Sequence, residues 1–232
     1  MTDTRRLFAL PLLGLVLSGH ATAADSSEFW PEASLFVQMT PETRLYLDAS
    51  YARDKESRDH SLDASAYLDV SLAPLLRKEL RTEDWQRSRF LWTRVGYTRV
   101  FKSNNGGPTS VAENRLSAAL YAKTELPAEV WLEGRARVDL RWVGSDFSTR
   151  ERFRLEVNRE FMVREHAVVP YMQVEAFYDP RYHAWVRMLY QPGVEITLDP
   201  HFRLELYLAR QDDRLPEPRT VNAFGIVAKW YY

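Results

Sequence analysis

Arginine recurs at alternate positions along two neighbouring stretches of this 232-residue chain. A guanidinium group presents its N–H donors as a planar fork, which matches the oxygens of carboxylates and phosphates. Two kinds of chemistry fit such a row. One is a ladder lining a passage for anions or small acidic solutes, and the other is an ion-paired network that fills an interior. The six arginines are Arg135, Arg137, Arg141, Arg150, Arg152 and Arg154.

The two stretches predict the two strands of a β-hairpin. In the first, from Val130 to Trp142, one face has seven uncharged residues and the other has five charges among six residues. This period of two residues is that of a strand, and no helical stripe of 3.6 residues fits it. After a break at 143–148, the second arm alternates in the same way, with Phe153 and Leu155 on one face and the arginines on the other. Each arm has about ten to fourteen residues, which suits a strand tilted across a bilayer.

Nine further segments alternate in the same way, which gives eleven strand-like segments in all. No backbone amide can stay unpaired in hydrocarbon, so an apolar-faced sheet in a membrane must close on itself. We therefore predict an all-β fold, a closed antiparallel up-and-down transmembrane β-barrel of 10–12 strands. Bacterial barrels of one chain have even strand numbers, so either Ala33–Met39 is not a full crossing or a short strand is missing from the count. We favour twelve. Pro74–Ser88 breaks the alternation and predicts a short helical or irregular connector.

The soluble alternative is a periplasmic β-sandwich or small barrel that buries the same apolar face. The length of the strands and the lack of charge on the apolar face favour the membrane barrel. The last strand favours it too, because it alternates and ends in an aromatic residue, like the carboxyl-terminal signal read by the barrel-assembly machinery of Gram-negative bacteria. The residues of this predicted assembly signal are Phe224, Ile226, Ala228, Trp230 and Tyr232.

The N-terminus predicts a secretory signal peptide over 1–23. Arg5 and Arg6 precede an apolar core, and Ala21-Thr22-Ala23 fits the cleavage site. Residues 24–232 then form a single outer-membrane barrel domain, exported through the general secretory route to the outer membrane of a Gram-negative bacterium. The mature chain holds 29 basic and 31 acidic residues and no cysteine, so neither nucleic acid nor disulfide chemistry is indicated. The mean hydropathy of −0.41 still suits a barrel, in which only alternate residues face lipid.

The charged faces of the predicted strands point into the lumen, and ten arginines balance ten acids there. The inward arginines concentrate on the predicted hairpin that contains Arg135 and Arg152. The remaining inward arginines are Arg94, Arg115, Arg187 and Arg203. The inward acids are Asp48, Asp63, Asp69, Glu113, Glu133, Asp139, Glu156, Glu175, Glu195 and Glu205.

An enzymatic site is the least favoured interpretation. His60-Ser61 could belong to an outer-membrane hydrolase, and Asp59-His60 with Asp212-Asp213 could form a protease rim, but each needs a third group that sequence cannot place. The histidines have no metal-ligand spacing. We therefore predict no enzyme, no metal site and no cofactor.

The mature chain resembles an uncharacterised family of Gram-negative outer-membrane β-barrels, a domain of unknown function. The resemblance implies the location and the fold but no reaction. It is carried by Trp30, by Arg94-Val95-Gly96-Tyr97, by Glu113-Asn114-Arg115-Leu116, by the alternating arginines from Glu133-Gly134-Arg135 to Arg154, by Glu175-Ala176-Phe177-Tyr178 and by Val221-Asn222-Ala223.

Two functions remain open at this point. The first is a narrow channel for anions or small acidic solutes, lined by the arginine ladder. The second is a plugged structural or accessory barrel that docks a periplasmic partner through Pro74–Ser88. In both, the expected partners are outer-membrane lipid and the barrel-assembly machinery.

Overall fold

The structure is a computed structural model that describes residues 24–54, 60–72, 90–103, 112–215 and 218–232. The predicted signal peptide and the predicted connector at 74–88 lie outside these residues. The described chain is built of strands and one 3₁₀ turn. They are β1 (Ala24–Gln38), β2 (Thr43–Asp54), β3 (His60–Ser71), β4 (Leu91–Ser103), β5 (Glu113–Leu126), η2 (Pro127–Glu129), β6 (Val130–Val143), β7 (Asp146–Arg159), β8 (Phe161–Val163), β9 (His166–Asp179), β10 (Ala184–Asp199), β11 (Phe202–Asp213) and β12 (Arg219–Tyr231).

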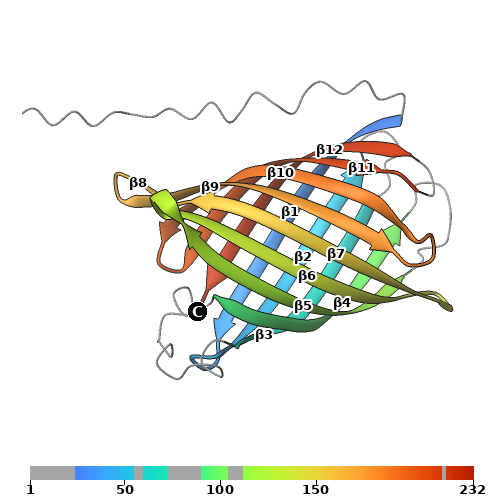
Figure 1. The fold of residues 1–232 in the computed structure, drawn as a ribbon, viewed down its shortest axis with the longest axis horizontal. Coiled ribbons are helices and arrows are strands. Elements are labelled where there is room, and N and C mark those ends of the chain that lie inside the picture. Colours follow the sequence, from blue (N-terminus) through green and yellow to red (C-terminus); the bar gives the residue numbers. More distant parts are fainter. Residues whose placement is uncertain (1–23, 55–59, 73–89, 104–111, 216–217) are drawn as a thin grey trace, which may run out of the picture.

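The strands close into a barrel (Figure 1). Each strand pairs antiparallel with the next around the wall, and the three-residue β8 pairs with β9 alone. The ring closes where β1 pairs with β12, and these two strands run parallel. Eleven of the strands formed by the described residues therefore make the wall, with β8 as a short addition.

The predicted range of strand numbers holds, but the preference for twelve in the wall and the rule of even numbers were wrong. An even number is required only when every neighbouring pair is antiparallel. The parallel pair removes that requirement, and the first strand is a full crossing, Ala24–Gln38, rather than the partial Ala33–Met39.

The barrel is apolar outside and polar inside, because successive side chains of a strand point to opposite faces. Leu208, which points outward, is 61% exposed, whereas Asp139, which points inward, is 0% exposed. The outward face does carry some charge, contrary to expectation. Arg99 donates a hydrogen bond to Asn114 on this face, and Glu151 stands opposite the exposed Val138.

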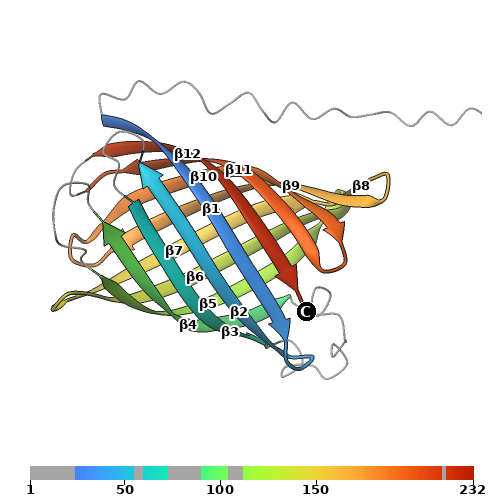
Figure 2. The ribbon, with the colours of Figure 1, turned by 180° about the vertical axis from the view of Figure 1, so that it is seen from behind.

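The two ends of the barrel differ in which strand connections they hold (Figures 1 and 2). The chain ends beside the β1–β2 turn, where the amide of Gln38 donates to the carbonyl oxygen of Tyr232 at 2.6 Å. This C-terminal end also holds η2 and the strand ends that flank 73–89. The opposite end holds the β6–β7 turn, where Gly144 has a φ of 62°, and the strand ends that flank 55–59 and 104–111.

Three inward tyrosines lie over glycines of the neighbouring strand. Tyr207 is opposite Gly225, and a Cβ placed on that glycine would overlap the tyrosine ring. Tyr67 with Gly96 and Tyr171 with Gly193 repeat the arrangement. The absence of a side chain on the glycine therefore lets the ring lie flat against the wall.

We expect Gly225→Val to lower the free energy of unfolding by about 1–3 kcal/mol, since the new side chain must displace the Tyr207 ring. Gly134→Val is the matched control, because the nearest atom to its Cβ would be Leu155 Cδ2 at an ordinary 3.8 Å. The measurement is a urea titration in which the folded fraction is read as the faster-migrating band of unheated samples on a gel. Equal midpoints for the two variants would contradict the packing role of the tyrosine.

Candidate functional site: the lumen lattice

The inward alternation of β5, β6 and β7 places arginines directly opposite one another. Arg115 faces Arg141 between β5 and β6, and Arg137 faces Arg152 between β6 and β7. Like charges directly opposite in an antiparallel pair destabilise it. Each pair therefore needs a carboxylate close by. The carboxylates that serve them, with their arginines, are called the lumen lattice: Glu113, Glu133, Asp139 and Glu175, with Arg115, Arg135, Arg137, Arg141, Arg150, Arg152 and Arg154.

Glu113 joins the first pair of arginines. Arg141 donates from Nε to Oε1 at 2.7 Å and from Nη2 to Oε2 at 2.9 Å. Arg115 donates from Nη2 to the same Oε1 at 2.9 Å. The carboxylate, only 1% exposed, thus bonds to two guanidinium groups that face each other between β5 and β6, and its single charge offsets half of their positive charge.

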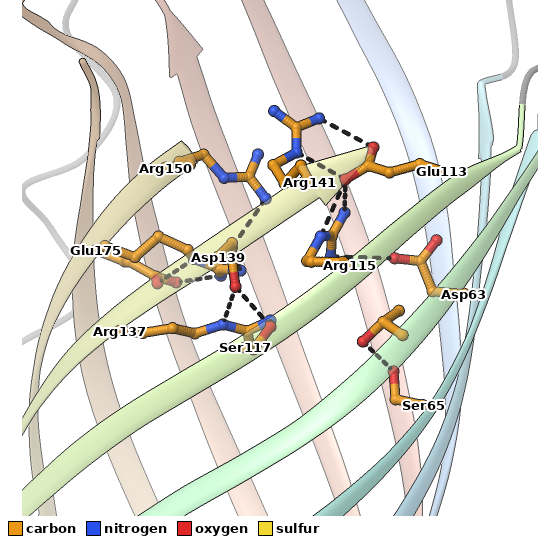
Figure 3. Close-up of polar contacts among 12 residues, drawn as sticks. Asp63, Ser65, Glu113, Arg115, Ser117, Arg137, Asp139, Arg141, Arg150 and Glu175 are labelled. Atoms are coloured by element: carbon orange, nitrogen blue, oxygen red, sulfur yellow. Dashed lines mark hydrogen bonds and ion pairs between the residues drawn. The ribbon is translucent and has the colours of Figure 1, made fainter. Parts of the chain in front are cut away.

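Asp139 lies at the middle of the lattice (Figure 3). It accepts hydrogen bonds from Arg137 Nε at 2.6 Å and from the hydroxyl of Ser117 at 2.8 Å. Arg150 approaches at 3.3 Å and Arg152 at 3.8 Å. One buried carboxylate is therefore shared by three cations from β6 and β7, which together carry more charge than it can offset.

Glu175 connects strands that are not neighbours. It lies on β9, yet Arg135 of β6 donates to it at 2.5 Å, across the intervening β7. Arg152 of β7 donates to both of its oxygens, at 2.7 and 2.9 Å. Glu175 is 2% exposed, so the arginine arms cover it. This residue ties three strands of the wall together.

The part of the lattice nearest to the C-terminal end of the barrel is built around a single arginine, Arg154. Arg154 donates to Glu133 at 2.6 Å and lies 3.9 Å from Glu156. Throughout the lattice the acids are the more deeply buried groups, because the longer arginines fold over them. Ion pairs held in this way are screened less by water than surface pairs, and removing one partner leaves a buried charge without compensation.

Arg94 belongs to a separate cluster near the C-terminal end of the barrel. It donates to both oxygens of Asp69, at 2.6 and 2.9 Å, and Arg44 donates to the same carboxylate at 2.8 Å. The guanidinium of Arg94 lies 4.1 Å from the centre of the Tyr46 ring, which stacks on Phe36. Arg44 was not among the predicted lumen residues, although its inward position on β2 follows from the same alternation.

The predicted lumen residues Arg187, Glu195, Arg203 and Glu205 lie on β10 and β11, where they meet Lys229 of β12. Lys229 donates to Glu195 at 2.6 Å and lies 2.5 Å from Glu205. Arg203 donates to Glu195 at 2.9 Å, and Arg187 is bonded to Asp213. Lys229 was missed, because only the outward residues of the last strand were considered. The alternation of β12 places Lys229 on the inner face, together with Val227 and Tyr231.

The residues of the predicted assembly signal share the outer face of β12. Phe224, Trp230 and Tyr232 are exposed, and Phe224 stacks on Phe29 of β1 with ring centres 6.0 Å apart. Ile226 and Ala228 stand between them in the alternation. Their role in assembly stays a prediction.

Of the residues considered for hydrolysis, Asp59 lies outside the described residues, and Asp212 and Asp213 bond to other side chains. Asp212 accepts from Arg210 and Thr220, whereas Asp213 accepts from Arg187 and Gln211. His60 lies beside the ring of Tyr51. In the part of the chain that the structure describes, no three His, Cys, Asp or Glu side chains form a group that could hold a metal ion. Over the same residues, no helix is long and apolar enough to cross a membrane. The absence of enzymatic activity stays a prediction.

Comparison with known proteins gives a likeness of fold. No family model matches the sequence, and no curated protein is a significant match, so the resemblance to an uncharacterised family stays a prediction. Among solved structures, the chain is similar to the β domain of the Bordetella autotransporter Brka. The TM-score is 0.50, at 14% sequence identity, and the alignment covers 81% of this chain and 83% of that one. The chain therefore has a β-barrel fold of the kind found in an autotransporter β domain.

Proposed function

We propose that this chain is an outer-membrane β-barrel of the structural or accessory kind, with a lumen braced by the lumen lattice rather than arranged as an open arginine ladder. The observation that carries the proposal is Glu175, a buried carboxylate held by arginines of two other strands. In an open ladder the guanidinium groups would be free to exchange passing anions. In this barrel they are bonded to the wall.

The outer surface supports the membrane location. Exposed apolar side chains cover the middle of the strands, as Leu155 and Leu208 do. Aromatic pairs stand at both ends of the barrel: Trp142 with Phe147 at one and Phe202 with Trp230 at the other, with ring centres 5.2 and 5.3 Å apart. Aromatic girdles at the two interfaces of a membrane have this arrangement.

The accessory role rests on topology. The strand ends that flank 73–89 lie at the C-terminal end of the barrel, the periplasmic end in our proposal. The two strands that the predicted connector joins, β3 and β4, thus meet it on the side where a periplasmic partner could be met.

A narrow anion pathway is the second candidate, and one observation favours it. Among the described residues, the part of the lumen around Asp139 holds more arginines than acids, so these residues keep a net positive charge after their ion pairs are formed. Such a wall would favour anions over cations.

A planar-bilayer recording of the refolded protein separates the two candidates. We expect no stable anion-selective openings, because the arginine arms are fixed against the wall. Flotation of the protein with lipid vesicles, together with a heat-dependent shift on gels, confirms that a silent sample is inserted and folded. Stable anion-selective openings that weaken when Arg135, Arg137, Arg152 and Arg154 are neutralised would replace our proposal with the pathway.

A further inference from the structure

Arg150 is the member of the lumen lattice with the weakest compensation. Among the described residues, its guanidinium has one ion pair, to Asp139 Oδ2 at 3.3 Å. That carboxylate already takes a shorter hydrogen bond from Arg137 at 2.6 Å. The buried Nε of Arg150 has no hydrogen-bond partner. A buried cation with so few bonds is costly unless an anion lies beside it.

The surroundings of Arg150 add to the positive charge. Its charged neighbours include Arg152, Arg141 and Arg115, with Asp139 as the compensating acid. Figure 3 shows the ends of Arg150 and Arg141 next to each other, with Arg115 below them. Arg141 and Arg115 share the single carboxylate of Glu113. Counted over the described residues that form ion pairs in this part of the lumen, six arginines meet four acids: Arg115, Arg135, Arg137, Arg141, Arg150 and Arg152 against Asp63, Glu113, Asp139 and Glu175.

The guanidinium groups are held in place before any ligand arrives. Arg141 is fixed by its two bonds to Glu113. Arg150 lies over the ring of Phe177, with its Cζ 5.4 Å from the ring centre, and Arg152 lies over the same ring at 4.5 Å. Because these donors are already ordered, binding of an anion loses less side-chain entropy than binding by flexible arginines would.

Arg141 and Arg150 are close to the ends of their strands. Arg141 stands two residues before the end of β6 at Val143, and Arg150 stands four residues after the start of β7 at Asp146. Both therefore lie near the end of the barrel opposite the C-terminus. Of the lattice arginines on β6 and β7, they are the ones nearest to this end.

We propose that Arg141 and Arg150, with Arg115 beneath them, form a binding site for a small oxyanion such as phosphate or sulfate. An anion with several oxygens accepts from two guanidinium forks at once, which a spherical chloride cannot do. A bound oxyanion adds negative charge beside Arg150, whose guanidinium has one ion pair among the described residues. It goes beyond the structural role proposed above and requires no passage through the barrel.

The test is the temperature at which half of the folded protein in detergent converts to the unfolded band on a gel. Sodium phosphate and sodium sulfate are compared with sodium chloride at equal ionic strength. At ten times the dissociation constant, phosphate should raise the wild-type midpoint by about 3–6 °C. Arg150→Gln should remove this rise. Arg203→Gln is the matched control and should keep it, because Arg203 is also a lumen arginine with an unpartnered Nε but lies on β11.

The site would be refuted by a wild-type midpoint that is the same in phosphate, sulfate and chloride, or by an equal rise in Arg150→Gln. If Arg150→Gln does not fold, Arg150→Lys keeps the charge and loses the fork. Titration calorimetry with phosphate should then show binding weakened by about tenfold or more relative to wild type. Unchanged affinity would overturn the assignment. These outcomes do not depend on the conductance test of the proposed function. A barrel that conducts ions can still bind phosphate, and a barrel that does not conduct can fail to bind it.

Discussion

Glu175→Gln is expected to lower the free energy of unfolding of the folded barrel by about 3–5 kcal/mol, because it leaves Arg135 and Arg152 without their shared carboxylate in a buried place. The amide of glutamine keeps the size of the side chain and one acceptor but carries no charge. The effect should therefore come from electrostatics and not from a cavity. The measurement is a urea titration of protein folded in detergent, followed by tryptophan fluorescence and by gel mobility of unheated samples.

Glu156→Gln is the matched control for this change. Glu156 also points into the lumen, but it lies 3.9 Å from Arg154 and its side chain is 19% exposed. Removing its charge should cost about 1 kcal/mol or less, as for pairs that water reaches. If the two variants unfold at the same urea concentration, Glu175 has no special part in holding the wall together, and the proposed structural role of the lattice fails with it.

Leu208→Arg is expected to cost about 2–4 kcal/mol in lipid vesicles, because the residue points outward from the middle of β11. In the proposed membrane setting, this side chain faces the centre of the hydrocarbon layer, where an arginine is least tolerated. The measurement is a urea titration of protein folded into vesicles.

Leu198→Arg provides the comparison at the edge of the membrane. Leu198 is exposed and stands one residue before the end of β10, at the C-terminal end of the barrel. An arginine there can reach the headgroups, so the cost should be about 0–1 kcal/mol. A barrel that does not cross a membrane would show no such dependence on depth, and equal costs for the two variants would count against the outer-membrane location.

Much of the fold could be predicted from the period-two pattern, because alternation alone decides which side chains share a face. Arg137 and Asp139 were placed inward and Val138 outward in this way, and the structure agrees. The parallel contact between β1 and β12 could not be predicted, since the pattern of a strand is the same whether its neighbour runs parallel or antiparallel. The outward Glu151 was also overlooked, although it lies between the inward Arg150 and Arg152 and the same alternation places it on the outer face.

The residues of the candidate site could be chosen from the sequence, but their partners could not. Glu175 stands opposite Arg154 in the register of β7 and β9. It is nevertheless bonded to Arg152, one diagonal step away, and to Arg135 of β6. Long side chains reach diagonal neighbours as easily as directly opposite ones. The pairing therefore depends on the register and on the direction in which each side chain extends along its strand. That is why an apparent ladder of arginines proved to be bonded to the wall.

The parallel seam also determines the order in which the barrel can form. Every antiparallel contact around the wall joins strands that are close in sequence, whereas the seam joins the first described strand to the last. Closing so long a loop carries the largest entropic cost, so this contact forms last. Until then β1 and β12 each present an unpaired edge, which is prone to aggregation. β12, which ends at Tyr231, is thus one of the two strands whose outer edge is paired last.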